Sequence, residues 1–258
     1  MSIGLVLSGG GMRGAAHIGV IKALEEHGIH ATHITGTSAG AIVGALYSYG
    51  YNWEEILVFF KSFQLVDITK YAYGKPGFID ADKYYPMLKT YLKEDNFKFL
   101  KRKLTITATD ILEGNLKTFS RGELIKPVLA SAAFPGVFSP VKMKNSYYVD
   151  GGVLNNFPVD LLKSKCDLLI GIYVNGFHHI KKEDIKHSYS VVERAFKIKS
   201  YQEDLQKFKD CDMMIAPNQL GNYGTFDKKN IDVIFKIGYE TAIEAIESNA
   251  DLLSKYNL

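Results

Sequence analysis

The sequence has no long hydrophobic run and little that resembles a targeting segment. Its most apolar candidate, residues 39–46, is far shorter than the roughly 18 to 20 residues that a transmembrane helix needs. The first seven residues carry no basic segment, and their apolar run stops at Ser8. We therefore expect neither a membrane span nor a signal peptide.

Cysteine is also scarce. Cys166 and Cys211 are the only two, and neither belongs to a C-x-x-C pair or to a cluster with histidine. This excludes a disulfide framework and gives no indication of a zinc or redox site. Isolated cysteines before apolar runs are typical of buried thiols in a reducing compartment, so we expect a cytoplasmic protein.

An excess of charge of one sign is missing as well. The formal net charge is only +3, which gives no indication of nucleic-acid binding because that usually requires a concentrated basic stripe. What the chain does have is apolar content: 47% of its 258 residues, too much for a disordered protein. This length allows one large domain, and we expect residues 1–258 to form it.

Short apolar runs alternate with helical periodicity from the first residues onward. Residues 3–7 and 33–35 are predicted to be strands, and each is followed by a glycine-containing turn and an amphipathic helix that ends before Gly28 or Gly50. The alternation continues, with strands predicted at 104–109, 116–119, 147–149, 168–174 and 213–215 and helices at 123–133, 191–208 and 231–246. This order predicts an α/β fold with a largely parallel central sheet.

Residues 47–99 interrupt the alternation. This segment holds 15 of the 32 aromatic residues in the chain. We interpret it as a helical insert that serves as a lid or as a wall for an acyl chain. Trp53, Phe59, Phe60 and Phe63 would face a chain or a bilayer, and lysines 61, 70, 75, 83, 89 and 93 would favour anionic lipid. The alternative is helices that pack on the sheet with solvated lysines.

A glycine-rich loop follows the first strand. Residues 9–14 read Gly-Gly-Gly-Met-Arg-Gly and match the G-x-G-x-x-G pattern of dinucleotide-binding loops. That fingerprint also requires an acidic residue at the end of the second strand, but residues 29–35 contain none. The alternatives are a tight turn, or an oxyanion hole in which the amides of Gly9, Gly10 and Gly11 converge on a developing negative charge.

The second strand runs into Gly36-Thr37-Ser38-Ala39-Gly40, a G-x-S-x-G motif. Between a strand and a helix, this motif places serine on a strained turn with its hydroxyl exposed. Ser38 is therefore our candidate nucleophile. The alternative role is an N-cap of the following helix.

A serine hydroxyl needs a neighbouring base, and the sequence offers two. Asp150 ends a predicted strand and is followed by Gly151 and Gly152; in a dry pocket its pKa would rise to a useful value. His178 and His179 follow a later strand, and with Asp150 they would form a Ser-Asp-His triad, although they open a polar stretch typical of a solvated loop.

These three motifs, in this order and at this spacing, resemble the patatin-like phospholipase family. Residues 130–141 (ASAAFPGVFSPV) and 152–159 (GVLNNFPV) resemble it too, so the resemblance covers residues 3–159. It implies a three-layer α/β/α sandwich and hydrolysis of acyl esters in lipids without metal or cofactor. It also implies Ser38 as the nucleophile, Asp150 as its dyad partner and an oxyanion hole at Gly9–Gly11. Arg13 would anchor the loop or bind a substrate phosphate, with Gly14, Gly36, Gly40, Gly151 and Gly152 as supporting motif residues.

The resemblance leaves the substrate open, because the family acts on phospholipids, lysophospholipids, acylglycerols and other acyl esters. We expect an acyl lipid as partner, peripheral membrane contact, and no nucleic acid. Two other functions stay open: an esterase or thioesterase that uses His178 or His179, and a lipid-binding or regulatory protein without catalysis.

Overall fold

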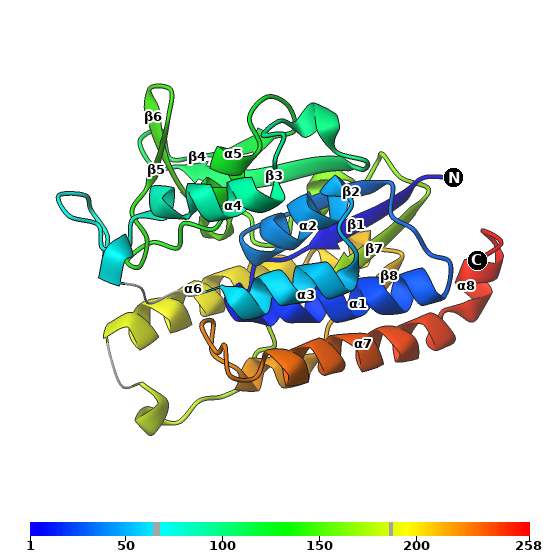
Figure 1. The fold of residues 1–258 in the computed structure, drawn as a ribbon. Coiled ribbons are helices and arrows are strands. Elements are labelled where there is room, and N and C mark those ends of the chain that lie inside the picture. Colours follow the sequence, from blue (N-terminus) through cyan, green and yellow to red (C-terminus); the bar gives the residue numbers. More distant parts are fainter. Residues whose placement is uncertain (64–67, 186–187) are drawn as a thin grey trace.

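The computed structural model describes residues 1–63, 68–185 and 188–258 (Figure 1). Their strands form one eight-stranded sheet in the order β5-β6-β3-β2-β1-β7-β8, with β4 paired to β3. The five strands from β3 to β8 along this order run parallel, whereas β4, β5 and β6 pair antiparallel, so the sheet is largely parallel as predicted. The strands are β1 (Ile3–Leu7), β2 (His33–Gly36), β3 (Lys103–Asp110), β4 (Asn115–Phe119), β5 (Val141–Met143), β6 (Ser146–Asp150), β7 (Leu168–Ile172) and β8 (Met213–Ile215).

Helices cover both faces of the sheet, because successive strand side chains point to opposite sides. Leu5 and Leu7 of β1 belong to the larger core, together with residues of α1, α2, α5 and α7. Val6 belongs to a smaller core on the other face, where Tyr201 of α6 packs. The predicted three-layer sandwich is confirmed. The helices are α1 (Ala15–Glu26), α2 (Ala39–Tyr49), α5 (Ile125–Ser131), α6 (Ser188–Leu205), α7 (Ile231–Ser248) and the short α8 (Ala250–Ser254).

Glycines set the close packing of α1 against α7, which lie side by side in Figure 1. A Cβ at Gly19 would lie 2.1 Å from the Phe235 carbonyl oxygen, and one at Gly238 would lie 2.2 Å from the Ala16 carbonyl oxygen. Each helix therefore presents a bare backbone to the other. This contact buries the C-terminal helix that the 3.6-residue periodicity predicted.

Between α2 and β3 lie helices α3 (Trp53–Ser62) and α4 (Tyr85–Tyr91), with short 3-10 turns around them. Asn52 and Glu55 form a capping box at the start of α3, which explains why the helix begins at Trp53. Residues 47–49 belong to α2, which ends because Gly50 adopts a φ of 118°. In the described part of the chain, no helix combines the length and apolarity needed to cross a bilayer.

The pairing of β3 brings two distant segments together. Ile106 pairs with both β2 and β4, and residues 108–110 pair with both β4 and β6. A strand has only two edges, so β2 and β6 must share one edge of β3. Gly36, near the end of β2, lies opposite Ile106, and Asp150, at the end of β6, lies opposite Ala108. The ends of β2 and β6 therefore meet.

Candidate active site

Ser38 occupies the sharp turn between β2 and α2. Its backbone has φ 54° and ψ −119°, a conformation that costs energy for any residue with a side chain. The flanking glycines are required, because a Cβ at Gly36 would lie 2.4 Å from the Gly40 carbonyl oxygen and one at Gly40 would lie 2.3 Å from that of Leu7. The Ser38 amide donates to the Ser131 hydroxyl at 2.8 Å, which fixes the turn from α5. The strained serine turn predicted from the G-x-S-x-G motif is thus present.

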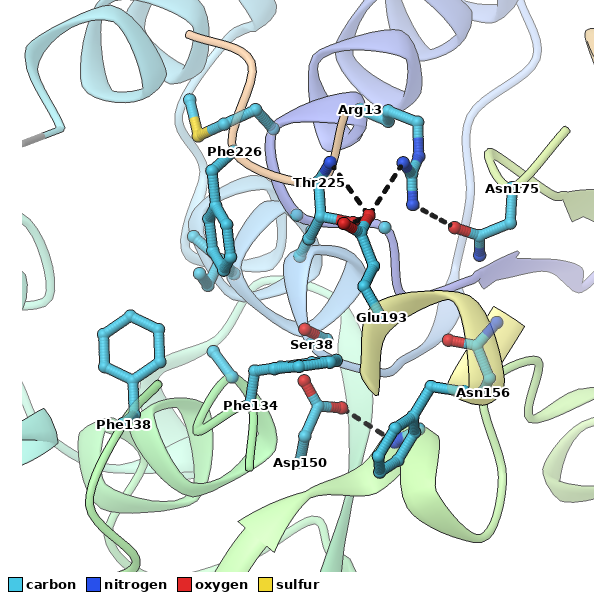
Figure 2. A pocket seen from close by; sticks show the side chains of 18 of the residues that line it. Arg13, Ser38, Phe134, Phe138, Asp150, Asn156, Asn175, Glu193, Thr225 and Phe226 are labelled. Atoms are coloured by element: carbon cyan, nitrogen blue, oxygen red, sulfur yellow. Dashed lines mark hydrogen bonds and ion pairs between the residues drawn. The ribbon is translucent and has the colours of Figure 1, made fainter. Parts of the chain in front are cut away.

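Asp150 faces Ser38 from the end of β6 (Figure 2). Its side chain is buried, and burial raises its pKa to about 6 against the opposing effects of the Gly152 amide, 2.7 Å from Oδ1, and of the Ser38 side chain. Gly151 permits this approach, since a Cβ there would lie 2.4 Å from the Thr107 hydroxyl. A carboxyl group with this pKa is mostly ionised at neutral pH and remains basic enough to accept a proton.

The glycine loop lies beside the serine, and its three amides differ. The Gly9 amide donates to the Asn156 carbonyl at 3.0 Å. In the ranges that the structure describes, no protein acceptor is found for the amides of Gly10 and Gly11, and both residues line the same cavity as Ser38. Of the three predicted oxyanion-hole donors, these two therefore have the suitable placement, and Gly9 is engaged within the protein.

Arg13 and Gly14 continue the loop into its supports. The buried guanidinium of Arg13 donates to the Asn175 side-chain oxygen at 2.7 Å and to the Tyr223 carbonyl at 2.9 Å. Asn175 in turn donates to the Gly9 carbonyl at 2.5 Å. These are the contacts of a loop anchor, one of the two roles predicted for Arg13. A Cβ at Gly14 would lie 2.9 Å from that of Ala39, so the loop packs directly on α2.

Ser38 and Asp150 line one cavity of about 1000 Å³ that is partly open to solvent. We call Gly10, Gly11, Ser38 and Asp150 the floor. The aromatic wall consists of Phe59, Phe60, Phe63, Phe134 and Phe138, and the polar wall consists of Arg13, Asn175, Glu193, Lys197 and Thr225. Figure 2 shows Phe134 and Phe138 on one side of Ser38 and Arg13, Glu193 and Asn175 on another.

The polar wall holds charges that sequence reasoning missed. Glu193 accepts from the Thr225 hydroxyl and lies 3.6 Å from the Lys197 amine and 4.0 Å from the Arg13 guanidinium. Burial raises the pKa of Glu193, but these partners outweigh it and the net pKa is lowered. Burial, together with the charge of Arg13, lowers the pKa of Lys197 to about 8. Helix α6, which carries Glu193 and Lys197, has no motif in the sequence that marks it as part of a site.

The aromatic wall is built largely from the insert. Phe59, Phe60 and Phe63 line the cavity as predicted, whereas Trp53 stacks on Phe235 of α7, with ring centroids 5.5 Å apart. A second, apolar cavity of about 380 Å³ shares Ile42, Phe59, Phe63, Ala132 and Phe138 with the first and extends to Met87 and Leu88 of α4. The two cavities are therefore neighbours that share these apolar lining residues.

Most of the insert lysines have partners within the protein. Lys61 pairs with Asp232 at 2.5 Å, Lys75 pairs with Asp80 and Asp82, and Lys89 donates to the Lys93 carbonyl. Lys83 donates to two carbonyls, and the Lys70 amine lies 4.2 Å from the centre of the Tyr84 ring. These contacts match the alternative of packed helices with surface lysines, and attraction of the lysines to anionic lipid stays a prediction.

The histidine alternative finds no support in the placement of its residues. His178 and His179 are exposed, and neither lines the cavity that holds Ser38 and Asp150. The His178 carbonyl accepts from Arg194 of α6. In the described ranges, no group of three or more His, Cys, Asp or Glu side chains is arranged to hold a metal ion.

Comparison with known proteins identifies a family for the part of the chain that contains these motifs. The family model described as patatin-like phospholipase matches residues 5–163. An uncharacterized NTE family protein of Mycobacterium tuberculosis is 33% identical over 180 residues, which is 67% of this chain and 49% of the relative. A lysophospholipase NTE1 of Meyerozyma guilliermondii is 26% identical over 280 residues, covering 96% of this chain and 19% of the relative. The chain thus spans about half the length of the mycobacterial relative.

The fold has a solved counterpart. The crystal structure of VipD from Legionella pneumophila matches with a TM-score of 0.62 and 17% sequence identity, and it covers 96% of this chain and 67% of that one. At this identity the likeness concerns the arrangement of sheet and helices.

Proposed function

Since the chain belongs to the patatin-like phospholipase family, we propose that it is a serine hydrolase that cleaves acyl esters of lipids through a Ser38–Asp150 dyad. The observation that carries the proposal is the joint placement of a serine on a strained turn and a buried carboxyl group of raised pKa in one cavity. Each feature costs stability, and both are typical of catalytic groups.

The reaction follows from the floor of the cavity. The Ser38 Oγ attacks the acyl carbonyl carbon while Asp150 accepts the hydroxyl proton. The amides of Gly10 and Gly11 stabilise the negative charge that develops on the carbonyl oxygen. The ester C–O bond then breaks, the alcohol leaves with the proton from Asp150, and the acyl group remains on Ser38. Asp150 next takes a proton from water while the water oxygen attacks the acyl carbon. The bond between that carbon and the Ser38 Oγ then breaks, Asp150 returns the proton to Oγ, and the fatty acid leaves.

The walls suggest how a lipid would lie. The aromatic wall and the apolar cavity behind it suit an acyl chain, because a pocket of carbon atoms offers no hydrogen bond to a polar group. The polar wall, with two cations and Glu193, suits a head group. We therefore expect a substrate with at least one long acyl chain and a polar head, with phospholipids and lysophospholipids ahead of fully apolar esters.

Labelling with a fluorophosphonate probe tests the catalytic proposal. The native chain should react and the Ser38→Ala variant should not. Loss of ester hydrolysis in Asp150→Ala with retention in His179→Ala would support the dyad, and the reverse pattern would restore the histidine alternative. A chain that neither reacts with the probe nor cleaves any ester of a panel varied in chain length and head group would be a non-catalytic lipid-binding protein.

A lipid substrate has consequences for the partners of the chain. We expect peripheral contact with a membrane surface, because such substrates reside there. A cytoplasmic location stays a prediction that rests on the two isolated cysteines, Cys166 and Cys211. Nucleic acid has no place in this function.

A further inference from the structure

One loop of the insert exposes three aromatic side chains. Residues 71–79 connect the 3-10 turns Ile68–Lys70 and Ala81–Tyr84, and the exposed fractions of Tyr71, Tyr73 and Phe78 are 47%, 85% and 68%. The only charged residue within the loop is Lys75. Large aromatic groups gathered on a protein surface mark a place where something binds.

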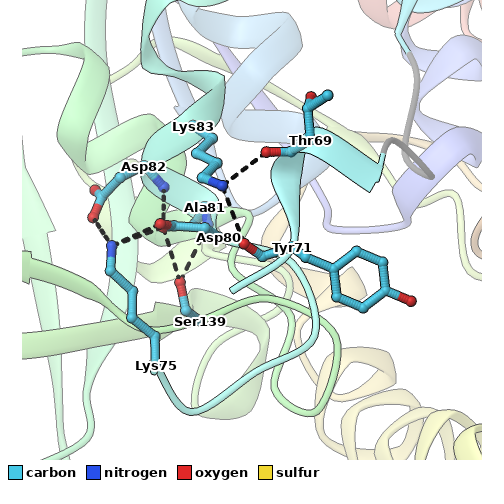
Figure 3. Close-up of polar contacts among 8 residues, drawn as sticks. All are labelled: Thr69, Tyr71, Lys75, Asp80, Ala81, Asp82, Lys83 and Ser139. Carbon is cyan, nitrogen blue, oxygen red and sulfur yellow. Dashed lines mark hydrogen bonds and ion pairs between the residues drawn. The ribbon is translucent and has the colours of Figure 1, made fainter. Parts of the chain in front are cut away.

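The loop is held firmly, so these side chains are presented by a defined backbone. Figure 3 shows the Lys83 amine between the carbonyl oxygens of Thr69 and Tyr71, at 2.7 and 3.1 Å. The Lys75 amine pairs with Asp80 at 2.9 Å and with Asp82 at 3.0 Å. The charges at the base of the loop therefore have partners within the protein, although Lys75 and Lys83 remain exposed, and the residues that project furthest from the loop are aromatic.

The same loop is joined to the wall of the cavity. The amides of Phe78 and Ile79 both donate to the Val137 carbonyl, and the Ser139 amide donates to the Ile79 carbonyl at 2.8 Å. Phe138, which lies between Val137 and Ser139 in the chain, lines the cavity. In Figure 1 the loop, coloured cyan, projects from the end of the molecule toward which the parallel strands run. Ser38 follows one of these strands, β2, and therefore lies toward the same end.

We propose that Tyr71, Tyr73 and Phe78 form a docking surface for a lipid bilayer, which brings the mouth of the cavity to its substrate; this rests on the proposed function. Aromatic rings, those with hydroxyl groups above all, favour the boundary between head groups and acyl chains. The surface continues through the backbone contacts of Phe78 into an aromatic wall suited to acyl chains. Because its charges are neutralised locally, it needs no anionic lipid to bind.

Vesicle co-sedimentation tests this surface. All variants carry Ser38→Ala so that the vesicles stay intact, and the vesicles contain phosphatidylcholine alone or with an added anionic lipid. Partitioning onto phosphatidylcholine vesicles should fall at least tenfold in Tyr71→Ser/Tyr73→Ser/Phe78→Ser. The control Phe99→Ser, which changes a 50% exposed aromatic residue just before β3 begins, should bind within twofold of the parent. The single variant Tyr73→Ser, at the most exposed ring, should lose part of the binding, and thermal melting checks that each variant folds.

Several results would overturn the proposal: no binding to either vesicle, equal binding by the triple variant and Phe99→Ser, or binding that needs anionic lipid and ignores the triple substitution. A concentration-dependent dimer that the triple variant dissolves would assign the surface to a second copy of the chain. Hydrolysis of a soluble ester by the native chain is measured separately. Vesicle binding without hydrolysis would refute only the proposed function, and hydrolysis without vesicle binding would refute only the docking surface.

Discussion

The floor and the walls of the cavity are held in place by different means. The floor is fixed by backbone: Ser38 and Asp150 sit at strand ends, and their flanking glycines leave no room for a Cβ. The walls are formed by side chains from several elements, among them Phe59 and Phe60 of α3 and Glu193 and Lys197 of α6, whose rings and charges contact neighbouring side chains at ordinary packing distances. A side chain added at one of these glycines must move backbone, whereas a change of a wall side chain can be absorbed by its neighbours. We therefore expect the floor to set whether the reaction occurs and the walls to set which substrate is used.

The largest effect should come from Asp150→Asn. Without a base, ester hydrolysis should fall by about a thousandfold or more. Burial raises the pKa of Asp150 from its ordinary value to about 6, so the folded state is destabilised once the pH is high enough to ionise the carboxyl group. Asparagine removes this penalty, so the variant should be more stable than the native chain at neutral pH. At neutral pH the gain should be up to about 3 kcal/mol. Rates and urea unfolding check both; a variant that is less stable at pH 7 but equally stable at pH 4 would contradict this account.

A matched pair of glycines on α2 separates backbone constraint from packing. In Gly40→Ala the new Cβ meets the Leu7 carbonyl oxygen, so the serine turn must shift and activity should fall about a hundredfold. In Gly44→Ala the new Cβ lies 3.2 Å from the ends of Ile34 and Leu104, which can move, and the gain in helix propensity of about 1 kcal/mol offsets the crowding. Initial rates and melting curves of the two variants provide the comparison. Equal losses of activity in Gly40→Ala and Gly44→Ala would show that the backbone beside Ser38 is no more constrained than the rest of α2.

The pH dependence of kcat/KM should report the ionisation of Asp150 in the floor. Because Asp150 must be ionised to accept the serine proton, kcat/KM should fall about tenfold per pH unit below about pH 6 and level off above it. An uncharged soluble ester avoids titration of the substrate. An inflection near 4 would mean that burial does not raise the pKa of Asp150, and an inflection near 6 that persists in Asp150→Asn would assign it to another group.

In the polar wall, Lys197→Met should act on substrate choice. The KM for a lysophospholipid should rise about tenfold, because the amine beside Arg13 no longer stabilises the phosphate, while the KM for the matching monoacylglycerol should stay within twofold. Parallel kinetics on the two esters measure the ratio. Equal changes for both substrates would instead assign Lys197 a structural part in holding Glu193.

The smallest effect should come from the aromatic side. Met87 lines the second, apolar cavity together with Phe59, so Met87→Trp should reduce the room for an acyl chain there. We expect a few-fold loss on long-chain esters and none on short ones. A panel of esters of increasing chain length gives the measurement, and a uniform loss at every length would mean that the chain does not enter this cavity.

The same contrast explains what the sequence could predict. Strand β1 is buried on both faces, so its run of apolar residues identifies it, and the motifs at strand ends locate Ser38, Asp150 and the glycine loop. The carboxyl ends of parallel strands gather at one edge of a sheet, so local patterns sufficed to predict that the glycine loop after β1 lies beside Ser38 after β2. Asp150 ends the antiparallel strand β6, so its place opposite Ser38 depends on the pairing of β6 with β3, and the sequence indicated it through the family resemblance.

The walls depend on long-range packing and left no such pattern. Glu193 and Lys197 occupy successive turns of α6 and read as an ordinary i, i+4 pair; only the path of α6 back over the sheet brings them to Arg13. The short strand β5 was missed because its three residues, Val141–Met143, show no alternation of their own and gain strand structure by pairing with β6. Trp53 was assigned to a lipid-facing surface from its residue type, although it packs on α7.

The shared edge of β3 has a consequence for how activity is acquired. Ser38 and Asp150 lie 112 positions apart in the chain, yet both take their position from residues 106–108 of one strand. Pairing of β6 closes a far longer loop than any helix does, and long-range pairings form slowly. During refolding, recovery of ester hydrolysis should therefore lag behind recovery of helical circular dichroism, so the onset of hydrolysis would report when the sheet is completely paired.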